Sequence, residues 1–293
     1  QADSLRSAAA LAGGLGVSTF ERLIVAGNVP VRMLNIQYRM HPAISLFPGH
    51  QFYKQEDSTL EACAWCKSRG LPFCQRGLHD GVDAAAKERK DVAFAWPDPS
   101  QPTMFLQVDG PDDQHPQGHS KFNEREAIAV SQSVRALRAA GAQMSEIGVI
   151  TGYAAQKALI RSTLLQDLSA EDAAAVDVAS IDQYQGREKP FIIVSLVRSN
   201  TKHTIGFFGS ANRLNVALTR AQNGLIIVGD LRTFVKKPMF REMGRSYRER
   251  GLLRVGSVSS SAVFKITLAQ EEVTQGEERA LAEALARLGP LDA

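Results

Sequence analysis

The chain has 293 residues, of which 44% are hydrophobic and 22% charged, values that are ordinary for a soluble globular protein with one large core. No stretch approaches the roughly 20 apolar residues of a membrane span, and Gln1–Gly16 lacks the pattern of a signal peptide, so we expect an intracellular protein. The net charge of +3 is too small to indicate nucleic-acid binding by itself.

The charges are unevenly distributed along the chain. Between Asp182 and Arg254 there are 14 Lys and Arg against 5 Asp and Glu, whereas from Glu271 to the end there are 2 against 6. A basic block of this kind is compatible with a face that binds a polyanion, but solvated arginines on a surface helix would give the same count.

The first third of the chain shows few regular patterns. Ser18 precedes an apolar helical pattern and predicts a capped helix start. A strand is expected at Arg32–Ile36, leading into a turn at Tyr38-Arg39. Residues 55–91 are rich in Cys, Gly and charges without a clear period, which indicates an insertion.

From residue 103 onward, predicted strands and helices alternate. The apolar runs predict strands at Thr103–Val108, Ile147–Thr151, Val176–Ala179, Phe191–Val197 and Leu225–Val228. Helical patterns cover Asn123–Ala140, Ala154–Leu165 and Arg213–Arg220, with a short helical turn at Gln183–Arg187. The alternation predicts an α/β fold, a parallel sheet with helices on both faces. Polar residues should then gather at the carboxyl ends of the strands: Arg39, Thr151, Ser180, Arg198 and Asp230.

Three runs carry most of the functional information. Asn212–Ala221 (NRLNVALTRA) places Arg213 and Arg220 seven residues apart, on one face of an expected helix. Gln37–Pro42 reads QYRMHP, and Ser180–Lys189 reads SIDQYQGREK. Each run alone has an ordinary structural explanation, such as a surface helix whose arginines point into water. Their occurrence together and in this order is highly specific.

Together the runs resemble the second RecA-like domain of superfamily 1 helicases, especially the up-frameshift-like RNA helicases of nonsense-mediated mRNA decay. The resemblance implies a RecA-like P-loop NTPase fold over residues 18–256, interrupted by the insertion at 55–91. Residues 1–17 would be an N-terminal remnant or linker, and residues 257–293 a linker with an acidic helical tail.

The resemblance also implies a nucleotide site. It assigns catalytic roles beside the γ-phosphate to Arg39, Arg220, Gln185 and Gly186, and contacts with the nucleotide to Tyr38 and Glu188. Guanidinium groups keep their charge and bridge phosphate oxygens, which suits the first two. Alternatively, Gln185-Gly186 is only a turn, and Glu188 is a surface partner of Arg187 or Lys189.

The cofactors would be ATP and Mg²⁺. The sequence has no GxxxxGK[ST] loop, no Asp-Glu pair after an apolar strand and no initiator Met, so we expect a fragment whose phosphate-loop and Mg²⁺-ligand half lies upstream.

A nucleic-acid-binding edge is implied on the other side of the sheet. Its expected residues are Thr151, Tyr153, Ser180, Asp182, Gln183, Arg198 and Asn200, whose side chains suit contacts with a nucleic-acid backbone. Gly152 stands where the family usually has Pro, which predicts a more flexible loop after Thr151. Ordinary polar strand ends are the alternative.

The three cysteines all lie within the insertion. Cys63, Cys66 and Cys74, with His79, offer three thiolates and an imidazole that could form a zinc site, although the spacing matches no common zinc module. Three reduced cysteines in an intracellular loop, or a mispredicted exon, are the alternatives.

The resulting hypothesis is the C-terminal motor half of an ATP-dependent RNA helicase. Its expected partners are single-stranded RNA, with DNA as an alternative, the upstream RecA-like domain and mRNA-decay factors, without any membrane. A cytoplasmic location is expected, with the nucleus as the alternative. Two other functions stay open: a non-catalytic RNA-binding or protein-interaction module, and a related DNA helicase.

Overall fold

A six-stranded parallel sheet is the centre of the computed structural model, which describes residues 7–27, 29–54, 60–68, 94, 96–116 and 118–256. The strand order is β10-β3-β9-β8-β6-β7, and every neighbouring pair is parallel. The strands are β3 (Thr103–Val108), β6 (Ile147–Thr151), β7 (Asp177–Ser180), β8 (Lys189–Ser195), β9 (Ala221–Gly229) and β10 (Leu253–Gly256). The alternation of strands and helices therefore gives the RecA-like α/β sheet that the sequence predicts.

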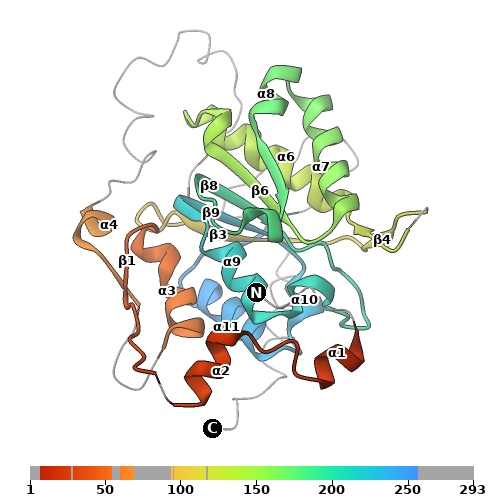
Figure 1. The fold of residues 1–293 in the computed structure, drawn as a ribbon. Helices are drawn as coiled ribbons and strands as arrows, with labels where there is room; N and C mark the ends of the chain where they lie inside the picture. The colour runs from red at the N-terminus through yellow and green to blue at the C-terminus, as the bar shows by residue number, and fades with distance from the viewer. Residues whose placement is uncertain are drawn as a thin grey trace.

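Helices cover both faces of this sheet (Figure 1). On one face lie α6 (Glu124–Ala139), α7 (Ala154–Asp167) and α8 (Ala170–Ala175). On the other lie α3 (Pro42–Phe52), α9 (Ala211–Leu218), α10 (Leu231–Phe234) and α11 (Pro238–Glu249). Side chains of β8 alternate between the two cores: Ile192 and Val194 enter one, and Phe191 and Ile193 the other. This double burial explains the continuous apolar run.

Smaller elements complete the described part of the chain. The short helices are α1 (Ala8–Ala12), α2 (Thr19–Val25) and α4 (Ala64–Ser68), and the 3₁₀ turns are η2 (Met144–Glu146), η3 (Asp182–Tyr184) and η4 (Gly206–Gly209). Two-residue strands are β1 (Ile36–Gln37), β2 (Glu61–Ala62), β4 (Asp113–Gln114) and β5 (Lys121–Phe122). Within the described ranges, no helix is both long enough and apolar enough to cross a bilayer.

The N-terminal predictions have mixed outcomes. The Ser18 Oγ accepts a hydrogen bond from the Glu21 amide at 3.1 Å, which confirms the capped start of α2. The strand expected at Arg32–Ile36 is wrong, since only Ile36 belongs to a strand, and that strand pairs with β2 outside the main sheet. Leu34 is 83% exposed, so the apolar residues here have no sheet to pack against. The tail beyond residue 256 and most of the insertion lie outside the described residues.

The helix expected at Arg213–Arg220 ends two residues early. Thr219 is the C-cap of α9, and its Oγ1 donates to the Asn215 carbonyl at 2.7 Å. Hydroxyl groups that bond their own backbone in this way compete with helix propagation. Arg220 therefore lies in the short link between α9 and β9, and it does not share a helix face with Arg213.

Candidate functional site

A pocket of about 390 Å³ lies where the loop before α3 meets the amino ends of β8 and β9. Its lining residues are Gln37, Tyr38, Arg39, Met40, Tyr53, Leu60, Glu188, Thr219 and Arg220. The structure thus brings together four of the predicted nucleotide-site residues: Tyr38, Arg39, Glu188 and Arg220. The expectation that Arg39 lies at the carboxyl edge of the sheet is wrong, because β1 does not join that sheet.

The loop that carries Arg39 is fixed by the side chain of Gln37. Its Oε1 accepts hydrogen bonds from the amides of Arg39 at 2.9 Å and Met40 at 2.7 Å, and its Nε2 donates to the Met40 carbonyl. The His41 amide donates to the carbonyl of Gln222 in β9 at 2.9 Å. The Arg39 Nη1 donates to the Thr219 carbonyl at 3.0 Å. The QYRMHP run therefore folds as a loop that presents one guanidinium beside the start of β9.

Arg220 reaches the same pocket from the end of α9. Its Nε donates to the Val216 carbonyl at 2.9 Å, and its Nη2 donates to the Thr219 Oγ1 at 2.7 Å. Burial, together with the nearby charge of Arg39, lowers the pKa of Arg220 below its usual range, although a guanidinium keeps its charge at any physiological pH. Two like charges facing one pocket favour the binding of an anion, because an anion would offset their repulsion.

Glu188 organises the pocket between the two arginines. It accepts hydrogen bonds from the Arg39 Nε and from the Gln222 Nε2, the latter at 2.8 Å. The bond from Arg39 holds the pKa of Glu188 below its ordinary value, so the carboxylate is ionised. The alternative that Glu188 pairs with Arg187 or Lys189 is not observed: Arg187 pairs with Asp177, and the Lys189 Nζ donates to the Ser145 carbonyl at 2.6 Å.

Gln185 and Gly186 lie outside the residues that line the pocket. Both are exposed, and they stand three and two positions before Glu188, respectively. Gly186 has a φ of 81°, a left-handed conformation that favours glycine, and a Cβ there would meet no atom within 4 Å. Their roles at the γ-phosphate therefore stay predictions.

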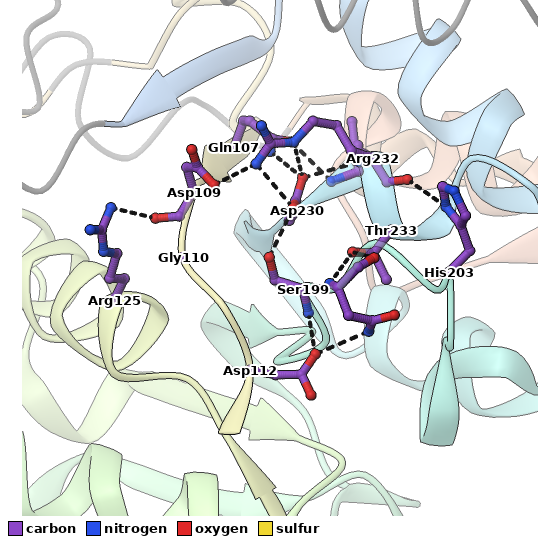
Figure 2. Close-up of polar contacts among 12 residues, drawn as sticks. Gln107, Asp109, Gly110, Asp112, Arg125, Ser199, His203, Asp230, Arg232 and Thr233 are labelled. Atoms are coloured by element: carbon purple, nitrogen blue, oxygen red, sulfur yellow. Dashed lines mark hydrogen bonds and ion pairs between the residues drawn. The ribbon is translucent and has the colours of Figure 1, made fainter. Parts of the chain in front are cut away.

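A second group of polar residues meets at the carboxyl ends of β3, β8 and β9, around Asp112 and the predicted strand-end residue Asp230 (Figure 2). Asp112 lies 3.1 Å from the Arg198 Nε and accepts from the Ser199 amide at 2.8 Å and the Asn200 Nδ2 at 3.0 Å. The loop that follows β8 is therefore held in one conformation.

Asp230, directly after β9, is buried and joins the same network. Its carboxylate accepts hydrogen bonds from the side chains of Gln107 at 2.6 Å, Ser199 at 2.9 Å and Arg232 at 2.8 Å. Figure 2 shows Arg232 reaching on to Asp109, at 2.6 Å. The sequence placed Asp230 at a strand end, and the structure shows that it connects the ends of neighbouring strands.

The loop after β6 packs against η4. Thr151 is fully buried, so its side chain lies in the interior in this conformation, and its assignment to the binding edge stays a prediction. A Cβ on Gly152 would lie 2.8 Å from the Phe207 Cβ, and the Tyr153 hydroxyl accepts from the Phe207 amide at 3.1 Å. Gly152 therefore permits close packing of the loop on η4, and the greater flexibility expected there stays a prediction.

Ser180, Asp182 and Gln183 surround the turn after β7. The Gln183 Oε1 accepts from the Ser180 amide at 3.1 Å, and Asp182 lies 3.6 Å from the Arg213 Nε. The Arg213 guanidinium stacks over the Phe207 ring, 4.0 Å from its centroid. Arg213 thus contributes to the carboxyl edge, whereas Arg220 contributes to the pocket at the opposite edge.

The predicted zinc residues are only partly described. The Cys63 Sγ accepts from the Cys66 amide at 3.4 Å, and Cys66 is buried. Cys74 and His79 lie outside the described residues. Across the ranges that the structure covers, no group of three or more His, Cys, Asp or Glu side chains is placed to hold a metal ion.

Sequence reasoning missed several residues of the pocket. Tyr53 follows α3, a helix that was not predicted, and its hydroxyl accepts from the Asn215 Nδ2 at 3.2 Å. Gln222 holds Glu188 from the start of β9, whose first four residues lay outside the predicted strand. The only signal in the sequence that could have indicated these two residues was their proximity to the three motif runs.

These features define a RecA-like α/β domain with a pocket lined by two arginines and a glutamate at one edge of its sheet. A family model described as an AAA domain matches residues 15–232. The chain belongs to this family, and within it to the up-frameshift-like superfamily 1 helicases.

Several curated relatives share this similarity. The chain is 37% identical over 249 residues to the regulator of nonsense transcripts 1 homolog of Neurospora crassa, an alignment that covers 84% of the chain and 21% of the relative. It is 34% identical to the ATP-dependent helicase upf1 of Schizosaccharomyces pombe, over 91% of the chain and 27% of the relative. It is also 34% identical to the ATP-dependent helicase NAM7 of Saccharomyces cerevisiae, over 90% and 25%. The chain thus spans about a fifth to a quarter of these relatives' length.

Proposed function

We propose that this chain is the C-terminal motor half of an ATP-dependent helicase and supplies Arg39 and Arg220 to an ATP molecule held by an upstream half. The observation that carries the proposal is the convergence of two backbone-anchored guanidinium groups on one pocket. The relatives named as ATP-dependent helicases support it.

The position of the pocket supports a contribution from one domain to another. Open parallel sheets generally bind their own ligands beyond the carboxyl ends of the strands. This pocket lies at the amino ends of β8 and β9 instead. Such a place suits side chains that complete the site of a neighbouring domain, whose phosphate loop and Mg²⁺ ligands would hold the nucleotide.

Each arginine would act on charge at the γ-phosphate. A guanidinium fixed before the reaction stabilises the charge that builds up on the phosphoryl oxygens, with little reorganisation. Glu188 would hold Arg39 in place and contact the ribose, and Tyr38 would line the nucleotide. Gln185 and Gly186 would approach the phosphate from the rim.

The carboxyl edge would bind single-stranded nucleic acid, RNA in the leading proposal and DNA in the alternative. Arg198, Asn200, Tyr153, Ser180, Asp182 and Gln183 carry the polar groups that this edge offers. Contacts with the backbone through such groups carry no sequence information, which suits a motor that moves along any sequence.

The test is ATP turnover by the protein extended upstream through the phosphate loop, with and without single-stranded RNA. Turnover stimulated by RNA is expected, and Arg220→Ala should lower it on the order of 10³-fold. The matched control is Arg138→Ala, which removes an exposed arginine of α6 and should leave turnover unchanged. Wild-type protein that binds RNA without turnover would instead identify a binding module.

A further inference from the structure

Val197, the second residue after β8, has an unusual backbone conformation. Its φ is 71°, in the left-handed region, although the side chain is β-branched and fully buried. The Arg198 amide donates to the Leu196 carbonyl at 2.8 Å, which closes a three-residue turn around Val197. A γ-turn with a positive central φ is rare and strained, and a β-branched residue is among the least suited to it. The surrounding structure must therefore hold this turn in place.

Two side chains from the start of α6 hold the peptide groups on either side of Val197. The Glu126 Oε2 accepts from the Val197 amide at 2.8 Å, and the Asn123 Nδ2 donates to the Val197 carbonyl at 3.2 Å. Asn123 is also the N-cap of α6, where its Oδ1 accepts from the Glu126 amide. The two residues are therefore fixed relative to each other and to the turn.

A second layer of buried groups fixes these two residues. The Ser195 Oγ donates to the Glu126 Oε2 at 2.7 Å, and the Gln156 Nε2 donates to that hydroxyl at 3.1 Å. The Gln156 Oε1 accepts from the Asn123 amide at 2.7 Å. All four side chains are buried. A connected buried network of this kind favours one arrangement, because a different one would break these hydrogen bonds inside the core.

The Val197 turn sets the direction of the backbone that follows it. Directly after it, Arg198 and Asn200 meet Asp112 at the carboxyl edge. We infer that Glu126 and Asn123 are positioning residues, which hold the Val197 turn and thereby fix the direction of the Arg198–Asn200 loop for strand binding. The binding part of this inference rests on the proposed function. In this inference neither Glu126 nor Asn123 contacts the nucleic-acid strand.

The test compares amide hydrogen exchange and RNA affinity in the 293-residue chain and its variants. Glu126→Ala should accelerate exchange of the Arg198 amide at least about tenfold and weaken binding of a fluorescent oligouridine about tenfold, since roughly 1.4 kcal/mol corresponds to a factor of ten. Glu126→Gln keeps an oxygen that can accept from Val197, so it should stay within about threefold of wild type.

The double variant Glu126→Ala/Val197→Gly separates positioning from packing. Glycine adopts a positive φ without steric strain, so the turn no longer depends on Glu126, and the double variant should regain most of the RNA affinity. A defect due only to a cavity would persist, because the second change removes more buried volume. Failure of this rescue, or unchanged exchange in Glu126→Ala, would overturn the inference.

The Arg198→Ala variant tests the proposed function separately, because it removes a side chain proposed to contact the nucleic acid. If that variant binds oligouridine as tightly as wild type, or if wild type does not bind, the loop is not a strand contact. The proposed binding edge would then be wrong, together with the strand-binding part of the inference. The exchange of the Arg198 amide still decides whether Glu126 holds the turn.

Discussion

Replacing Glu126 by glutamine should remove much of the dependence of stability on pH between about 4.5 and about 8. Burial raises the pKa of the Glu126 carboxyl to about 8, and the charges of Asp230 and Asp112 add to the rise, while hydrogen bonds from Ser195 and Val197 oppose it. In the unfolded chain the carboxyl has its ordinary pKa, 4.5. The folded protein therefore keeps a proton that the unfolded chain releases.

The sign and size of the effect follow from this difference. The stability that the protonated carboxyl contributes is fully present below about pH 4.5 and is lost as the pH rises through about 8. At about 1.4 kcal/mol for each pH unit, the loss is on the order of 5 kcal/mol at most. A glutamine cannot ionise, so the variant should lack this contribution.

The assay is urea unfolding followed by circular dichroism from about pH 5 to about pH 9, for wild type and Glu126→Gln. The stability of wild type should fall more steeply with pH than that of the variant. Glu124→Gln, which changes an exposed carboxyl two residues away, is the control and should keep the wild-type slope. Equal slopes for wild type and Glu126→Gln would refute the reasoning.

Three further predictions concern other parts of the two sites. Gly152→Ala places a Cβ 2.8 Å from that of Phe207, so overpacking should lower the unfolding free energy by about 1–3 kcal/mol in urea titrations. Asp230→Ala removes the buried acceptor of three side chains and should lower the same quantity by about 2–4 kcal/mol. Arg39→Ala removes the main cause of the low pKa of Glu188, so NMR titration of that carboxyl should show a higher pKa.

Each of these has a matched comparison. Gly118→Ala adds a Cβ that meets no atom within 4 Å, so a similar loss in that variant would contradict the packing argument for Gly152. Asp113→Ala changes an exposed aspartate near Asp112 and should have little effect beside Asp230→Ala. A pKa of Glu188 that does not move in Arg39→Ala, or that moves equally in Arg187→Ala, would contradict the assigned pairing.

The sequence predicted the sheet well because burial on both faces leaves a strong signal. Runs such as Phe191–Val197 are apolar at every position except Ser195, and this pattern distinguishes a central parallel strand from most alternatives. The segment Arg32–Ile36 carries similar residues, but no strand of the main sheet accepts it. Whether an apolar run pairs with a strand of the sheet depends on the tertiary structure, which the local sequence pattern does not contain.

The sequence predicted which residues form the candidate sites better than it predicted where their side chains point. Arg39, Glu188 and Arg220 were expected to act together, and they line one pocket. Thr151 ends a strand as expected, yet its side chain points into the interior, and one step along a strand reverses the face. The role of Gly152 depends on Phe207, 55 positions away, which no local pattern could reveal.

The central strand β9 connects the amino-end side of the sheet, where the pocket lies, with the carboxyl-end side as one continuous piece of backbone. Arg220 precedes its first residue, and Asp230 follows its last. Nine residues span roughly 25–30 Å, and β9 is hydrogen-bonded to strands on both sides, which makes it stiff along its length. A displacement of the Arg220 end of β9 would therefore also move the Asp230 end. Under the proposed function, the nucleotide contact at one end and the nucleic-acid contact at the other would then change together without any rearrangement of the core between them.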